Sequence, residues 1–250
     1  MTNQAGKMQL NCDLGESHGS WTMGMDADVM PYIDQANIAC GFHAGDPLTM
    51  RNTLALAAVH GVAIGAHPAY PDLVGFGRRS MNLSEEEIVA DLHFQISALD
   101  GMARNAGLEL SYVKPHGALY NDMMARVDVR SAILKALATY HRPMPLMLQA
   151  TPQADQHRDE ADALGLSLLF EAFADRCYDD DGMLLSRRKP GAVHSKERML
   201  EQVAQLCNEG TVTSVSGHTL PLKADPLCVH GDNVEGVQAI REIRALVSGG

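Results

Sequence analysis

Acidic, histidine and lysine side chains recur in this sequence directly after short apolar runs, and glycine or proline stands beside most of them. Residues 37–47 are the clearest example, because an apolar run leads into Gly41, His43, Gly45 and Asp46. Carboxylate and imidazole groups can together bind a divalent metal ion or act as general acid and base. The residues in comparable positions are Asp13, Glu16, His43, Asp46, His67, Asp72, Lys114, His116, Glu171, Asp175, Arg176, His230 and Asp232.

Each candidate also has a purely structural explanation. Asp13 and Asp46 could serve only as N-caps of the helices that follow them. A single histidine beside a strand is more often a structural group than a catalyst, but four histidines at four strand ends favour a common site. Lys114 could bind an anion, act as a base if burial lowers its pKa, or be an ordinary surface lysine. Cys228 is better explained as a buried structural thiol than as a nucleophile paired with His230.

A basic segment, made of Arg187, Arg188 and Lys189, follows an acidic run at residues 179–181. It could be a solvated loop. It could also be a mobile lid that brings cations over an anionic substrate. The sequence leaves both interpretations open.

The apolar runs predict the strands that would position these side chains. We expect strands at residues 8–12, 35–40, 62–66, 110–113, 145–149, 166–170, 211–215 and 227–229. Helices are expected at residues 26–34, 48–60, 85–105, 118–140, 153–164, 195–208 and 234–247, the third of them preceded by a capping box of Ser84 and Glu87.

Short apolar strands that alternate with helices are typical of a parallel sheet covered by helices. Over 250 residues we predict an α/β fold with a single (β/α) barrel domain of seven to eight strands. An open doubly wound sheet is the alternative. In a barrel, the candidate residues would share the face at the carboxyl ends of the strands.

Composition and charge narrow the classes of partner. Hydrophobic residues make up 46 % of the chain and charged residues 20 %, as in an ordinary soluble globular protein. The net charge of −11 argues against nucleic acid or an anionic membrane surface as the main partner. Five cysteines without a C-x-x-C pair, no secretory signal and no membrane-spanning apolar run favour a cytoplasmic protein. The chain has no P-loop and no G-x-G-x-x-G motif, so no nucleotide-binding loop is recognisable.

Seven motifs in this order resemble the LamB/YcsF family, which is understood as the A subunit of the bacterial 5-oxoprolinase. They lie at residues 11–16, 37–46, 65–72, 75–78, 113–121, 173–178 and 229–232, and the resemblance runs from about residue 9 to the last helix. Cys12 departs from the alanine that is more usual in the family, at a position within a strand where the change should matter little.

The resemblance implies a (β/α) barrel of about seven strands, similar to the glycoside hydrolase/deacetylase barrel. It also implies ATP-dependent hydrolysis of 5-oxo-L-proline to L-glutamate together with the B and C subunits of 5-oxoprolinase, and ATP with Mg²⁺ as co-substrate. A chemically reasonable route phosphorylates the lactam oxygen before water attacks the activated carbon, which requires cations and a general base. We therefore assign catalytic roles to Asp13, His43, His67, Lys114 and His116. Substrate or phosphate binding is assigned to Glu16, Asp46, Arg78, Glu171, Asp175, Arg176, His230 and Asp232.

Two other functions remain open. The chain could be a stand-alone metal-dependent deacetylase or amidohydrolase with Asp13, His43 and His67 as ligands, although their spacing matches no H-x-x-x-H or H-x-H signature. It could instead be a non-catalytic subunit that binds substrate while its partners do the chemistry. The ATP site is either of an unrecognised type or contributed by the partner subunits.

Overall fold

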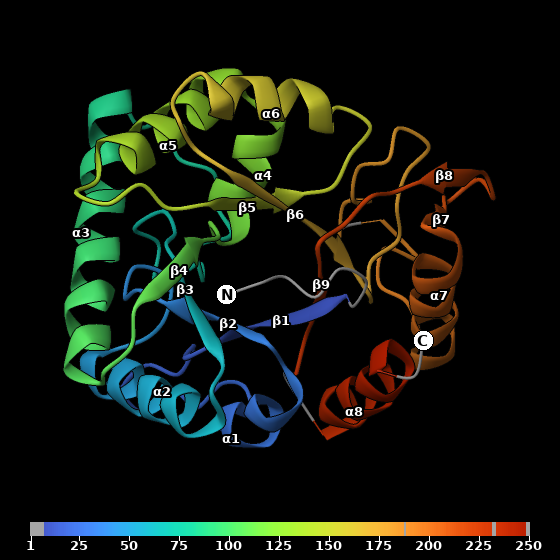
Figure 1. Ribbon diagram of the computed structural model, residues 1–250, viewed down its shortest axis with the longest axis horizontal. Helices are drawn as coiled ribbons and strands as arrows, with labels where there is room; N and C mark the ends of the chain where they lie inside the picture. The colour runs from blue at the N-terminus through green and yellow to red at the C-terminus, as the bar shows by residue number, and fades with distance from the viewer. Residues whose placement is uncertain (1–7, 188, 232–233, 249–250) are drawn as a thin grey trace.

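Seven parallel strands close into a barrel in the computed structural model, which describes residues 8–187, 189–231 and 234–248 (Figure 1). The strands are β1 (Gln9–Leu14), β2 (Gln35–Ala39), β3 (Ala63–His67), β4 (Leu110–Val113), β5 (Leu146–Gln149), β6 (Leu168–Phe173) and β9 (Pro226–Val229). Each strand pairs with the next along the chain as far as β6, which pairs with β9, and β9 closes the barrel against β1. The predicted α/β barrel is confirmed, with the lower of the two expected strand numbers.

The helices surround the barrel, as Figure 1 shows. They are α1 (Asp26–Val29) with the short 3₁₀ helix η1 (Met30–Tyr32), α2 (Pro47–His60), α3 (Glu85–Asn105), α4 (Gly117–Ala125), α5 (Val127–Thr139), α6 (Ala154–Asp162), α7 (Lys196–Glu209) and α8 (Val234–Ser248). Within the described ranges, none of these helices combines the length and the apolar character that a membrane span requires.

Side-chain caps define where two of these helices begin. Asp46 Oδ1 accepts hydrogen bonds from the backbone N–H groups of Leu48 at 2.8 Å and Thr49 at 3.0 Å, at the start of α2. Ser84 and Glu87 form the predicted capping box at the start of α3. Each cap ends the preceding loop at a defined residue, and the loop before α2 carries one of the candidate histidines.

The strand predicted at residues 211–215 does not join the barrel. Thr211–Thr213 form β7, which pairs antiparallel with β8 (Thr219–Pro221) in a separate two-stranded sheet outside the barrel (Figure 1). Val212 is buried, whereas both threonines of β7 are half-buried, so this strand has one apolar face where a strand covered on both sides needs two. Gly217, with φ +85°, lets the chain turn back between β7 and β8. The prediction of a barrel strand here is wrong, and β9 is the seventh strand.

The single helix predicted at residues 118–140 is also wrong, because two helices occupy this region. α4 ends at Ala125 and α5 begins at Val127, since Arg126 between them has an extended backbone (φ −126°, ψ 117°). The Arg126 guanidinium donates to the Asp128 carboxylate in the first turn of α5 at 2.7 Å. The break allows α5 to pack against α3 while α4 starts close to the end of β4.

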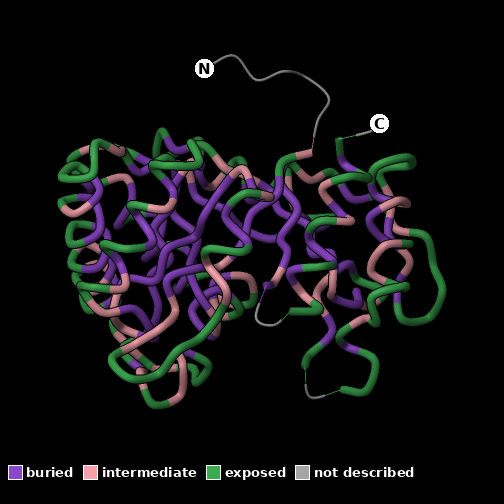
Figure 2. The backbone as a smooth tube through the Cα atoms, turned by 90° about the horizontal axis from the view of Figure 1, so that it is seen from below, coloured by how far each residue is buried: buried purple, intermediate pink, exposed green. Residues whose placement is uncertain are grey.

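An apolar core joins the strands to the helices. Leu10, Ile38 and Ile64 of the strands belong to the same buried cluster as Ile96 and Leu99 of α3. Figure 2 shows buried backbone through the middle of the molecule and exposed backbone along the outer loops and helix surfaces. The packed core provides a rigid frame for the strand ends.

Polar side chains occupy part of the barrel interior. Asn37 Nδ2 donates to Asn11 Oδ1 and Asp13 Oδ1, both at 2.8 Å, and Asn37 Oδ1 accepts from the Tyr112 hydroxyl at 2.6 Å. A Cβ atom at Gly65 would lie 2.2 Å from Tyr112 Cε2. Gly65 therefore makes room for the ring that positions Asn37, and Asn37 in turn positions Asp13.

We expect Gly65→Ala to lower the free energy of unfolding by about 1–3 kcal/mol, the usual cost of overpacking a filled interior. The added methyl group would press on the buried Tyr112 ring. Gly101→Ala is the matched control, because a Cβ at Gly101 in α3 meets nothing within 4 Å and alanine favours a helix. Urea denaturation followed by circular dichroism measures both variants. Equal stability of the two would contradict the packing role of Gly65.

Candidate active site

A cavity of about 640 Å³ lies at the carboxyl ends of the barrel strands. Asp13 of β1, His67 of β3, Gln149 of β5 and Phe173 of β6 all line it. A second cavity of about 310 Å³ adjoins the first. The residues that line both cavities are Asp13, Arg78, His116, Arg187 and His230. Residues from strand ends that are distant in the sequence therefore meet around one space.

Lys114 is a buried cation that lies between two carboxylates. Its Nζ atom is 3.1 Å from Asp13 Oδ1, 3.0 Å from Glu171 Oε2 and 3.3 Å from Cys228 Sγ. Burial lowers the pKa of Lys114, but Asp13, Cys228 and Glu171 raise it by more, so that it lies well above its usual value. The lysine is therefore charged at neutral pH, which favours an electrostatic role over that of a base. Burial also raises the pKa of the Cys228 thiol, as expected for a structural cysteine.

Asp13 is held as an ionised carboxylate. Its Oδ1 accepts hydrogen bonds from Asn37 Nδ2 at 2.8 Å and Lys114 Nζ at 3.1 Å. Its Oδ2 lies 3.4 Å from His67 Nε2 and 4.0 Å from His230 Nε2. Burial raises the pKa of Asp13, but His67 and Lys114 lower it by more, and the result is well below the usual value. The carboxylate thus keeps its negative charge at the wall of both cavities.

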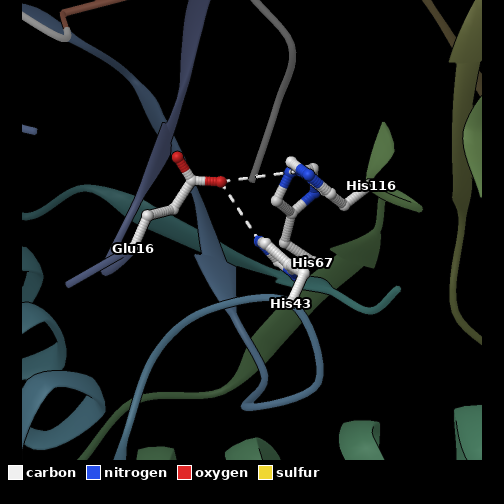
Figure 3. Close-up of side chains that lie close together, drawn as sticks. All are labelled: Glu16, His43, His67 and His116. Carbon is white, nitrogen blue, oxygen red and sulfur yellow. Dashed lines mark hydrogen bonds and ion pairs between the residues drawn. The ribbon is translucent and has the colours of Figure 1, made fainter. Parts of the chain in front are cut away.

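Glu16, His43, His67 and His116 converge in a compact cluster (Figure 3). Glu16 Oε1 lies 3.1 Å from His43 Nε2 and 3.5 Å from His116 Nδ1, and His116 Nδ1 lies 3.0 Å from His67 Nε2. One nitrogen or oxygen atom from each residue lies within 4.8 Å of the others. Two of the three predicted metal candidates, His43 and His67, belong to this cluster, while Asp13 lies beside it and contacts His67.

Burial governs the charge of the cluster. The rings of His43 and His116 stack with their centroids 3.7 Å apart and their planes at 6°. Burial lowers the pKa of His43 well below its usual value, and His67 lowers it further. Burial also lowers the pKa of His116 well below its usual value, with added repulsion from His43 and His67. Burial raises the pKa of Glu16. His43 and His116 are therefore neutral at neutral pH, and neutral imidazoles offer lone pairs.

His230 and Asp175 form an ion pair, with 3.1 Å between His230 Nδ1 and Asp175 Oδ2. Burial raises the pKa of Asp175, but His230 lowers it by more, to about 2. Burial lowers the pKa of His230, but Asp175 and Cys228 raise it by more, so that it lies well above its usual value. The pair is ionised at neutral pH and presents an imidazolium to both cavities. Asp232, the next predicted residue, lies outside the described residues.

Three arginines line the larger cavity, and they differ in what holds them. Arg176 is buried and donates to the carbonyl oxygens of Leu185 at 2.6 Å and Ala192 at 3.3 Å, so it anchors the main chain at these two residues. Arg78 and Arg187 are exposed and line both cavities. The sequence predicts Arg187 only as part of a possible lid, and its basic neighbour Arg188 lies outside the described residues.

The structure gives Asp46 a capping position away from the cavities. Besides capping α2, its carboxylate accepts from the Gly19 N–H at 2.9 Å, and the residue lines neither cavity. The polar residues that sequence reasoning missed are Asn11, Asn37 and Gln149. Each was a polar residue inside a predicted apolar strand, and such an interruption could have marked an inward-facing site residue.

A model of the LamB/YcsF family matches residues 8–249. The chain is 57 % identical over 244 residues to the second 5-oxoprolinase A subunit of Pseudomonas putida, which covers 97 % of this chain and 95 % of that protein. It is 55 % identical over 239 residues to the 5-oxoprolinase A subunit of Pseudomonas fluorescens, covering 95 % and 96 %. The crystal structure of a lactam utilization protein from Thermus thermophilus superposes with a TM-score of 0.89 at 38 % identity, covering 97 % of this chain and 96 % of that one.

We expect Lys114→Met to lower the free energy of unfolding by about 3–5 kcal/mol, because it leaves Asp13 and Glu171 without a cation in a buried site. Lys135→Met is the matched control: this lysine pairs with Glu85 at the surface, where solvent screens the interaction. Chemical denaturation of both variants at neutral pH measures the difference. A loss no greater than that of the control would show that Lys114 does not balance buried charge.

We also expect a pH-dependent stability contribution from His230 and Asp175. The depressed pKa of Asp175 stabilises the fold above about pH 4 and loses this effect as the pH falls toward about 2. The raised pKa of His230 stabilises the fold fully below about pH 6.5, and this is lost as the pH rises through the raised value. The stability difference between wild type and His230→Gln should thus be greatest between about pH 4 and 6.5. A difference independent of pH, in unfolding curves from pH 3 to about pH 9, would refute the ion pair.

Proposed function

This chain belongs to the LamB/YcsF family, and on that premise we propose that it is the A subunit of a 5-oxoprolinase. The proposed reaction hydrolyses 5-oxo-L-proline to L-glutamate and converts ATP to ADP and phosphate, in a complex with the B and C subunits. Relatives more than 50 % identical to it are named as A subunits of 5-oxoprolinase, and a solved relative is a lactam utilization protein. Since 5-oxoproline is a lactam, both names support the same class of scissile bond.

The observation that carries the proposal is the arrangement of charge around the two cavities. Asp13 is an ionised carboxylate between Lys114 and His67, and Arg78 and Arg187 lie at the cavity walls. The substrate carries a carboxylate, and phosphorylation of its lactam oxygen would add a second anion. Arginine guanidinium groups suit both anions.

The proposed route assigns roles to two groups of the site. Phosphate transfer from ATP activates the lactam oxygen, one water molecule attacks the ring carbon, and the C–N bond breaks as the nitrogen takes up a proton. A second water molecule is consumed when the phosphate is released. We propose that Asp13 orients a water molecule and accepts its proton, and that Lys114, 3.1 Å from Asp13, offsets negative charge on the reacting oxygens.

The proposal also requires a binding site for ATP. The sequence contains no recognisable nucleotide-binding loop. We propose that the triphosphate, with Mg²⁺, is bound either by Arg78 and Arg187 or by the partner subunits. The variants Arg78→Ala and Arg187→Ala distinguish these cases. Both should raise the KM for ATP if the two arginines bind the triphosphate, and neither should if the partner subunits bind it.

The direct test is the formation of ADP and glutamate by this chain mixed with the B and C subunits, with and without 5-oxoproline. We expect 5-oxoproline to stimulate ATP hydrolysis, and Asp13→Asn to lower turnover by about 10²–10⁴-fold, as expected on loss of a general base. Asp46→Asn is the matched control, because asparagine also caps a helix and Asp46 lies outside the cavities. Unchanged turnover in the Asp13 variant would favour a non-catalytic, substrate-binding role.

The cluster of Glu16 and three histidines favours one competing function, that of a metal-dependent amidohydrolase or deacetylase acting without ATP. The same assay distinguishes it. Hydrolysis of 5-oxoproline or of an acetylated sugar by the isolated chain in the absence of ATP would support this alternative and count against the 5-oxoprolinase proposal.

A further inference from the structure

The imidazole rings of His67 and His116 each have one nitrogen committed to a backbone carbonyl. His67 Nδ1 lies 2.7 Å from the carbonyl oxygen of Lys114, and His116 Nε2 lies 3.0 Å from that of Phe76. A carbonyl oxygen can only accept a hydrogen bond, so each of these ring nitrogens carries the proton. In the neutral form of each ring, the other nitrogen, His67 Nε2 or His116 Nδ1, is therefore a lone-pair acceptor.

These two acceptor nitrogens face each other at 3.0 Å. Two lone pairs at that distance repel unless a positive centre lies between or beside them. The geometry admits two such centres, a metal cation that both nitrogens coordinate or a single proton that the two rings share. The remaining members of the cluster decide between them.

Glu16 and His43 supply two further ligand atoms at the same point. Glu16 Oε1 lies 3.1 Å from His43 Nε2 and 3.5 Å from His116 Nδ1. A tetrahedral ion with bonds of about 2.0–2.1 Å has its ligand atoms about 3.3–3.4 Å apart. The contacts at 3.0, 3.1 and 3.5 Å are close to that spacing, and all four ligand atoms lie within 4.8 Å of one another. A shared proton would use only two of the four groups, whereas a cation uses all of them.

The backbone carbonyls that orient His67 and His116 are a second reason to favour a cation. Metal-binding histidines typically donate their other ring N–H to a carbonyl or carboxylate, which fixes the tautomer and the ring orientation. Both rings have this arrangement here. The four residues also come from the ends of four successive strands of the barrel, so the frame holds the ligand atoms in place before any ion binds.

We propose that Glu16, His43, His67 and His116 bind one divalent transition-metal ion, with Zn²⁺ as the best match to a set of three imidazoles and one carboxylate. Compared with the metal set predicted from the sequence, Glu16 and His116 take the place of Asp13. Asp13 is bound to Lys114 and Asn37 and lies beside the cluster through its contact with His67. The proposal concerns binding alone and stands whether or not the chain acts on 5-oxoproline.

The test uses the isolated full-length chain without substrate. The protein is stripped with a chelator, titrated with Zn²⁺ against a chromogenic competitor, and analysed for bound metal by mass spectrometry. We expect one Zn²⁺ per chain, a melting temperature that rises with Zn²⁺, and, with Co²⁺ in place of Zn²⁺, the strong visible absorption of a four-coordinate site. Weak binding with no defined stoichiometry would overturn the proposal.

Variants identify the ligands. We expect His116→Gln and Glu16→Gln each to weaken Zn²⁺ binding by more than the roughly 10–100-fold typical of groups that only orient a ligand. His60→Ala is the control, because His60 is an exposed histidine at the end of α2, outside the cluster. Full affinity in both cluster variants, shown to be folded by circular dichroism, would refute the assignment. A downfield proton resonance from an N–H···N bond between His67 and His116 in zinc-treated protein would likewise refute it and identify the shared proton.

Discussion

A positive charge removed from water must be balanced by its neighbours, and at the centre of this barrel that charge is Lys114. Its ammonium group contacts the carboxylates of Asp13 and Glu171 within about 3 Å. Without the lysine, the ionised Asp13 carboxylate would lose one of the two groups that lower its pKa the most. The ionised state of Asp13, on which the proposed chemistry depends, is therefore a consequence of where His67 and Lys114 lie.

This constraint extends outward through hydrogen bonds. Asp13 is oriented by Asn37, Asn37 is oriented by the Tyr112 hydroxyl, and the Tyr112 ring fits because residue 65 is glycine. Each link joins a different strand, so the polar interior also helps to set the register of the barrel. The charged centre and the frame around it stabilise each other.

The sequence was informative about the site for a topological reason. His43, His67 and His116 each follow a short apolar run, and parallel strands in a barrel bring such positions to one face. The contact between Glu16 and His43 was not predictable in this way, because it depends on the conformations of two turns. Asp46 was not predictable either. Its position in the sequence fitted a helix cap and a site residue equally well, and only its hydrogen bonds show that it is a cap.

The fold was predictable where strands are apolar on both faces, as in β9, which is buried along its whole length. The run around Val212 was equally short, but its alternation with threonine marks a strand with one exposed side, which a hairpin satisfies better than a barrel.

Arg176 anchors one wall of the cavity through main-chain atoms. Its guanidinium holds the two ends of a loop through the main-chain oxygens of Leu185 and Ala192. Every residue type provides such an oxygen, so side chains along this segment can be exchanged without loss of the anchor. The position of the wall therefore depends on main-chain atoms, whereas its chemistry depends on side chains such as the guanidinium of Arg187. A substitution in this loop can therefore change the chemistry of the cavity wall while the wall keeps its position.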